Sequence, residues 1–178
     1  MSGEERVRVH WMDLLRGGAV LLVVLLHVQD VAHQSSIPTP EALRVFNQFF
    51  APFRMPTLMF LSGMLLPPSL AKGLRRYYSG KVRNIAWPYL VWCLLFLLLG
   101  EGVRPIWDPL AWVAAGYLWY IFFLLCYYLL APLVSRVNAG TICIALLLIS
   151  TPLADGLPKY FLFFAAFFFA GNGVARSG

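Results

Sequence analysis

The chain has 178 residues, of which 60% are hydrophobic, 16% aromatic and 12% charged. A soluble domain carries about a quarter charged residues, so this chain has roughly half the charge that a water-exposed surface requires. Together with a mean hydropathy of +0.72, the composition excludes a soluble globular enzyme, a disordered chain and a disulfide-stabilised scaffold. It indicates an integral membrane protein.

Six uncharged stretches follow one another along the chain and predict six membrane-spanning helices. A spanning helix needs about 20 mostly apolar residues, which places these helices at about 13–33, 45–66, 84–101, 112–134, 138–153 and 158–175. Pro67 and Pro68 are predicted to end the second helix, because proline cannot continue the hydrogen-bond ladder. The expected fold class is therefore an all-α polytopic bundle, with a single transmembrane domain over residues 1–178.

The basic residues predict how this bundle is oriented in the membrane. Three short polar connections hold only Arg44, Arg104 and Lys159. The opposite side holds ten cations: Arg6, Arg8, Arg16, Lys72, Arg75, Arg76, Lys81, Arg83, Arg136 and Arg176. By the positive-inside rule, both termini face the cytoplasm, and we expect the protein in the inner (plasma) membrane. Cations confined to connections also exclude a nucleic-acid partner, which requires a basic soluble face.

The first predicted helix carries ionisable residues where a membrane makes them costly, so they are candidates for function. Arg16 and His27 are eleven positions apart, which places both side chains on one helical face. Asp30 follows three residues later and can reach the imidazole. A carboxylate beside a histidine favours general-base catalysis. The structural alternative is that Arg16 extends to the interface and His27 hydrogen-bonds to a neighbouring helix.

Arg54 lies between Pro52 and Pro56 in the second predicted helix. Prolines in a span free carbonyl groups that protein or cavity water must satisfy, so the pattern predicts a broken helix that lines a cavity. The alternative is that Arg54 anchors this helix at the outer interface. The phenylalanine-rich last helix is expected to face lipid.

The connection 72–83 concentrates five cations: Lys72, Arg75, Arg76, Lys81 and Arg83. At a cytoplasmic surface they would bind either anionic lipid headgroups or the phosphates of a nucleotide-bearing donor. The residues leave both interpretations open. No nucleotide-binding fingerprint and no metal-ligand spacing is present, so neither a metal nor a bound cofactor is expected.

Four stretches, taken together, resemble the membrane acyltransferase-3 family, which includes bacterial O-acetyltransferases of cell-surface polysaccharides. The first is an Arg-x10-His pattern formed by Arg16 and His27. The others are Phe53-Arg-Met-Pro-Thr-Leu-Met-Phe-Leu-Ser-Gly63, Lys81-Val-Arg-Asn-Ile-Ala-Trp-Pro-Tyr-Leu-Val-Trp92 and Leu118-Trp-Tyr-Ile-Phe-Phe-Leu124. Their order and separation follow the family pattern.

The resemblance implies transfer of an acyl group, usually acetyl, from acyl-CoA to a hydroxyl of a carbohydrate or lipid-linked glycan. His27 is then the catalytic base or acyl-handling residue, with Arg16 and Asp30 as its partners. Lys81 and Arg83 match the family's donor-binding basic pair, and Arg75 and Arg76 join them, although the spacing here is Lys-x-Arg and some members have Arg-x-x-Arg. We expect Arg54 and Trp119 to line the cavity.

The resemblance covers what would be the first six of about ten family spans, so the chain is expected to be an N-terminal part or a shortened relative. Two functions of other classes stay open. One is a transporter or flippase-like protein, with Arg16, His27 and Arg54 along a substrate path. The other is a non-catalytic membrane subunit derived from the family. Membrane lipids are expected partners in every case.

Overall fold

A computed structural model describes residues 10–99 and 104–177, which form helices and no strand. The α-helices are α1 (His10–Gln34), α2 (Glu41–Met64), α3 (Leu66–Leu70), α4 (Leu74–Lys81), α5 (Trp87–Leu98), α6 (Trp119–Val134), α7 (Ala139–Ser150) and α8 (Leu157–Ser177). A π-helical turn, η1 (Val82–Ala86), joins α4 to α5, and two 3₁₀ turns, η2 (Pro109–Trp112) and η3 (Gly116–Leu118), precede α6. The predicted all-α class is confirmed.

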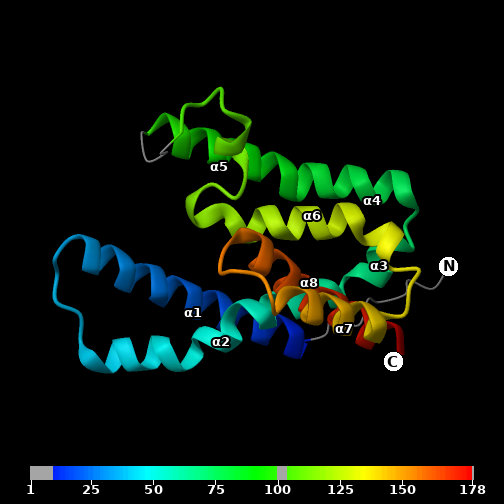
Figure 1. Cartoon of the computed structure of the whole chain (residues 1–178), viewed down its shortest axis with the longest axis horizontal. Coiled ribbons are helices and arrows are strands. Elements are labelled where there is room, and N and C mark those ends of the chain that lie inside the picture. The colour runs from blue at the N-terminus through cyan, green and yellow to red at the C-terminus, as the bar shows by residue number, and fades with distance from the viewer. Residues whose placement is uncertain (1–9, 100–103, 178) are drawn as a thin grey trace.

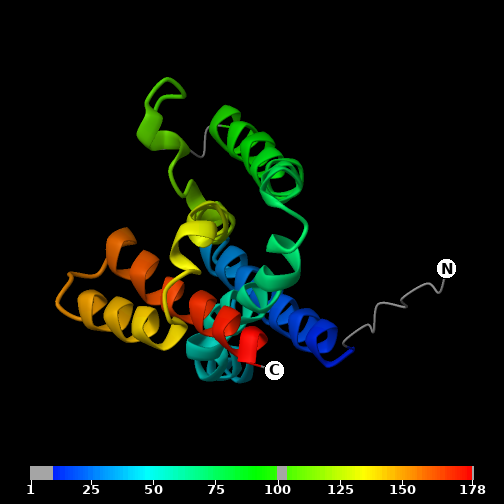
Figure 2. The same ribbon diagram turned by 90° about the vertical axis from the view of Figure 1, so that its right-hand side faces the viewer.

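The long helices run back and forth between two ends of the molecule (Figure 1). The start of α1, the end of α8, α3 and the start of α4 lie at one end, and the α1–α2 connection lies at the other. α6 lies between the rod formed by α4 and α5 and the pair α7 and α8, as both views show (Figures 1 and 2). This arrangement places the beginning of α1 and the end of α8 on the same side.

Two helix boundaries differ most from the sequence prediction. The third helix begins at Leu74, ten residues before the predicted 84, because α4, η1 and α5 follow without interruption. The basic connection is thus largely helical, and the π turn lies directly before Pro88, which cannot donate an α-helical hydrogen bond. The fourth helix begins at Trp119 instead of 112, because Ala114 and Gly116 adopt left-handed backbone angles.

Four helical stretches of the described residues are long and apolar enough to cross a membrane: Trp11–Gln34, Leu74–Leu98, Gly116–Val134 and Leu157–Ser177. α7 is shorter, with 12 residues. α2 has 24 residues, but Glu41 and Arg44 in its first turn make its beginning polar. α2 is held in the bundle by its contacts with α8 and α1.

The core of the bundle is formed where α2 crosses α8, the helix pair with the most extensive contact. A Cβ atom on Gly63 would lie 1.8 Å from the carbonyl oxygen of Phe168, and one on Gly171 would lie 2.0 Å from that of Phe60. Small residues of this kind let helix backbones approach closely in membranes. The two glycines therefore set the distance between α2 and α8.

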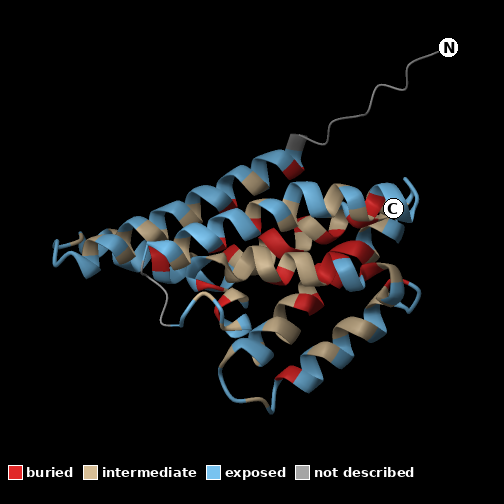
Figure 3. Ribbon diagram, turned by 90° about the horizontal axis from the view of Figure 1, so that it is seen from above, coloured by how far each residue is buried: buried red, intermediate tan, exposed pale blue. Residues whose placement is uncertain are grey.

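Buried residues gather in the middle of the bundle (Figure 3), and α8 supplies many of them. Phe168 is fully buried and Phe169 is 4% exposed. The prediction that this helix is lipid-facing is therefore wrong for its inner face. The reason is that its small residues Ala165, Ala166 and Gly171 lie on the buried face and admit close neighbours.

Replacing Gly171 with leucine should destabilise the protein by about 3 kcal/mol or more, the upper range for overpacked cores, because the new side chain meets the α2 backbone. Thermal unfolding of the detergent-solubilised protein measures this effect. Gly18→Ala is the matched control, since no atom lies within 4 Å of a Cβ there, and it should gain up to about 1 kcal/mol from helix propensity. Equal melting of Gly171→Leu and the unchanged protein contradicts the close crossing.

Candidate functional site

Arg16 connects α1 to the end of α2. Its Nη2 donates a hydrogen bond of 2.9 Å to the carbonyl oxygen of Leu61, one of the last four carbonyls of α2, which lack partners within the helix. A cation at a helix C-terminus also interacts favourably with the helix dipole. The neighbouring carbonyl of Ser62 accepts from the hydroxyl of Tyr128 at 2.9 Å. Arg16 therefore caps α2.

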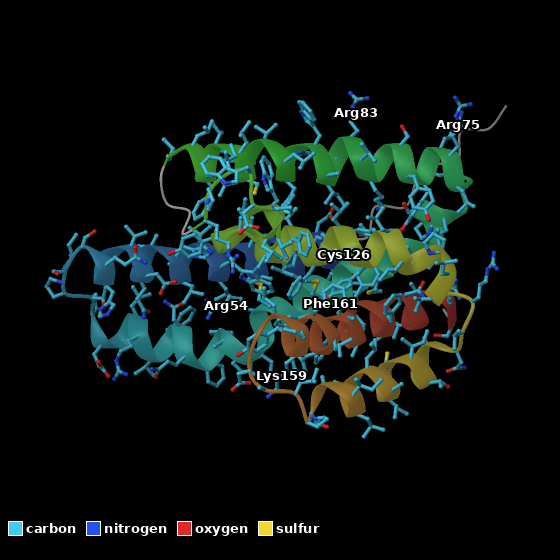
Figure 4. The ribbon with its side chains drawn as sticks, turned by 45° about the horizontal axis from the view of Figure 1, so that its top comes forward. Arg54, Arg75, Arg83, Cys126, Lys159 and Phe161 are labelled. Atoms are coloured by element: carbon cyan, nitrogen blue, oxygen red, sulfur yellow. The ribbon has the colours of Figure 1, made fainter. Side chains whose placement is uncertain are left out.

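Arg54 is buried between α1 and α2, with 3% of its surface exposed. Its Nη1 donates to the carbonyl oxygen of Leu22 at 3.2 Å, and its Nη2 donates to that of Asn47 at 2.7 Å. The Asp30 carboxylate of α1 interacts with it electrostatically. Figure 4 shows Arg54 within the bundle, so this side chain is not an exposed anchor.

The prediction of a broken helix around Arg54 is wrong, because α2 continues through Pro52 and Pro56. Each proline removes one ladder hydrogen bond without preventing helical angles in the residues that follow. Asn47, seven residues before Arg54, adds two further contacts to α1: its Nδ2 donates to the Leu25 carbonyl at 3.3 Å and to Oε1 of Gln29 at 2.7 Å. α2 is thus held against α1 by buried polar groups.

His27 lies beside Asp30 and, unexpectedly, beside Tyr117. Its Nδ1 is 3.9 Å from Oδ2 of Asp30, and the side chains are 37% and 39% exposed. The rings of His27 and Tyr117 meet edge to face, with centroids 4.8 Å apart and planes at 76°. Gln34 Nε2 donates to the Tyr117 hydroxyl at 3.2 Å. The imidazole therefore has a carboxylate on one side and an aromatic ring on another.

The structure does not bring Arg16 and His27 together. They are eleven positions apart in one helix, which corresponds to about 16 Å along the axis of α1. Arg16 is engaged at the end of α2, whereas His27 contacts the connection before α6. Of the three predicted catalytic residues, only His27 and Asp30 are neighbours.

The five predicted phosphate-binding cations divide into two groups. Lys81 turns inward, with its Nζ 3.5 Å from the ring centre of Tyr128 and 5.4 Å from that of Tyr77. The others are exposed: Lys72, Arg75, Arg76 and Arg83. Arg75 and Arg83 point away from α6 (Figure 4). Lys81 and Arg83 do not form a pair.

A cavity of about 500 Å³ lies between α2, α6, α8 and the segment before α6. Pro52 and Pro56 line it from α2, Gly116 from the connection and Trp119 from α6. Trp119 therefore lines this cavity. Arg54 does not, because its side chain donates a hydrogen bond on the side of α2 that faces α1. The lining side chains are apolar or aromatic, which suits a hydrocarbon chain better than a sugar.

The connection that carries Tyr117 is internally organised. Tyr89 donates from its hydroxyl to the Trp112 carbonyl at 2.6 Å, and Trp112 donates from Nε1 to the carbonyl of Ile106 at 2.8 Å. Arg104 donates to Asp108 at 2.9 Å, and this hydrogen bond lowers the pKa of the Asp108 carboxyl. Sequence reasoning missed Tyr117, because its contact with His27 is distant in sequence and follows no local period.

Comparison with known proteins identifies the family. A family described as "Acyltransferase domain" matches residues 9–178, nearly the whole chain. The chain belongs to the membrane acyltransferase-3 family. No curated protein and no solved structure matches it. The matched range contains Arg16, His27, Asp30, Lys81 and Arg83, so the resemblance seen in the sequence is confirmed at the level of the family.

Replacing Arg16 with methionine should lower the free energy of unfolding by about 1.5–3 kcal/mol, the usual cost of losing a hydrogen bond to a charged group. Arg16→Lys should recover part of the loss, because it keeps a cation at the C-terminus of α2. Arg136→Met is the control, since Arg136 is exposed in the α6–α7 connection. Chemical denaturation in detergent measures all three variants. An Arg16→Met protein that keeps its full stability but loses function contradicts the capping role.

Proposed function

We propose that the protein is a membrane-embedded O-acyltransferase that moves an acetyl or other acyl group from acyl-CoA to a hydroxyl of a carbohydrate or lipid-linked glycan. The observation that carries the proposal is the family match over residues 9–178, within which His27 lies beside Asp30 on α1. Membership of the family supports acyl transfer. The donor, the acceptor and the residue roles are our inference.

His27 acts as the general base. Its imidazole takes the proton of the acceptor hydroxyl while the hydroxyl oxygen attacks the thioester carbonyl carbon. The carbon–sulfur bond then breaks, and the departing CoA sulfur receives the proton from the imidazolium. Asp30, 3.9 Å from Nδ1, stabilises the imidazolium that forms between the two steps.

The donor binds at the end of the bundle that carries the start of α4. Arg75 and Arg76 are exposed there, and Arg83 is exposed further along the rod, in η1. These arginines are available to contact the phosphates of CoA, for which arginine is well suited. Lys81 lies deeper, against Tyr128. Anionic lipid headgroups would compete for the same arginines.

The acceptor approaches from the other half of the bundle. The apolar cavity there is bounded by Ala114 and Gly116, and Gly116 directly precedes Tyr117, whose ring lies against His27. A hydrocarbon chain in this cavity would hold a lipid-linked acceptor close to His27. The apolar lining therefore favours a lipid-linked glycan over a free sugar.

The orientation follows from the charges. The end of the bundle with the beginning of α1, the start of α4 and the end of α8 (Figure 1) carries the larger set of cations, which positive-inside placement puts in the cytoplasm. We place the protein in the inner membrane with both termini cytoplasmic. Arg75, Arg76 and Arg83 then face the cytoplasm, the compartment in which acyl-CoA is made.

His27→Gln tests the function. Glutamine retains a hydrogen-bonding group but cannot cycle a proton, so acyl transfer should fall by about 10²–10⁴, the usual contribution of a positioned base. Transfer of labelled acetyl from acetyl-CoA to a polyprenyl-linked oligosaccharide, by the purified protein in detergent, measures the rate.

The matched control is His33→Gln, an exposed histidine two turns further along α1, which should transfer at the normal rate. Both variants should express and insert equally well. Full activity of His27→Gln would make His27 a packing residue and refute the assignment of the site.

A further inference from the structure

Tyr117 contacts His27 from outside α1, and the chemistry proposed above does not involve it. It belongs to η3, far from His27 in the chain, yet the two rings meet edge to face at 4.8 Å. We propose that Tyr117 is a positioning residue that fixes the orientation of the His27 imidazole for catalysis. This inference rests on the proposed role of His27 as the base.

The tyrosine is itself held from α1 at two points. His27 contacts its ring, and Gln34 donates to its hydroxyl at 3.2 Å. His27 and Gln34 are seven positions apart and therefore lie on one face of the helix. Tyr117 is 54% exposed, but it spans the two turns between them, so its ring and its hydroxyl each have a partner on α1.

The backbone that presents Tyr117 is held in an unusual conformation. Ala114 has a φ of 49° and Gly116 a φ of 48°, a left-handed region that is costly for an alanine, and such strain gathers at functional sites. A Cβ on Gly116 would lie 2.6 Å from the ring of Phe96 on α5. Only glycine fits here without displacing that ring, and this fit fixes where the next residue points.

The Asp30 contact distinguishes the two nitrogens of the imidazole. Asp30 lies toward Nδ1, and Tyr117 meets the ring at a steep angle of 76°. With the ring restrained between these two neighbours, Nε2 is the nitrogen left to take the proton of an acceptor hydroxyl. An edge-to-face pair restrains ring rotation through the aromatic quadrupole.

Substitution of Tyr117 should change catalysis and not donor binding. Tyr117→Leu removes the ring and should lower kcat about tenfold, the upper range of an edge-to-face pair converted to a rate, while the KM for acetyl-CoA stays unchanged. Tyr117→Phe keeps the ring but loses the Gln34 hydrogen bond, so its kcat should lie between that of Tyr117→Leu and that of the unchanged protein. Trp107→Leu, an exposed aromatic in the same connection, is the control and should leave kcat unchanged.

A second measurement does not depend on transfer. Diethyl pyrocarbonate modifies exposed imidazoles, and mass spectrometry gives its rate at His27 relative to His33 in the same protein. Removing the ring in Tyr117→Leu should raise this ratio several-fold, whereas Trp107→Leu should leave it unchanged. An unchanged ratio, or an unchanged kcat in Tyr117→Leu, overturns the positioning role. If Tyr117→Leu raises this ratio but the unchanged protein transfers no acyl group, the proposed function is refuted, while the contact between Tyr117 and His27 is supported.

Discussion

The close crossing of α2 and α8 at Gly63 and Gly171 is the contact on which the rest of the bundle depends. Lipid is as apolar as a leucine side chain, so helices in a membrane gain little from hiding apolar surface and associate through close packing and hydrogen bonds. The two glycines allow this approach. α2, once fixed on α8, becomes the support to which α1 is attached.

α1 is held on α2 by polar groups distributed along the contact, of which Arg54 and Asn47 are buried. Arg16 binds the end of α2, Arg54 binds the Leu22 carbonyl near its middle, and Asn47 binds closer to the α1–α2 connection. Each would be expensive without its partner in a medium that has no water, so the set fixes the register of the two helices. That register puts His27 beside the connection before α6, where Tyr117 meets it. The candidate site is therefore a consequence of helix packing.

Much of this architecture was predictable, because long apolar runs specify spanning helices and four stretches, the Arg-x10-His pattern among them, together indicate the family. Prediction from the sequence failed where the same residue type occurs in two different environments. Phenylalanine faces either lipid or the core, so the burial of Phe168 was missed. The charges of Arg75 and Arg76 suggested a loop, yet an exposed helix face accommodates them. The contact of Tyr117 with His27 joins residues that no local pattern relates.

The most direct test of the account is acyl transfer by the purified full chain in oriented proteoliposomes. Radiolabelled acetyl-CoA is supplied to only one side, and the ester label is counted on a polyprenyl-linked oligosaccharide in the same membrane. The account predicts label on the acceptor only when the donor is on the side that exposes Lys72, the positively charged end of the bundle. Label that forms equally from either side contradicts the orientation and the donor site. No label from either side contradicts the proposed activity.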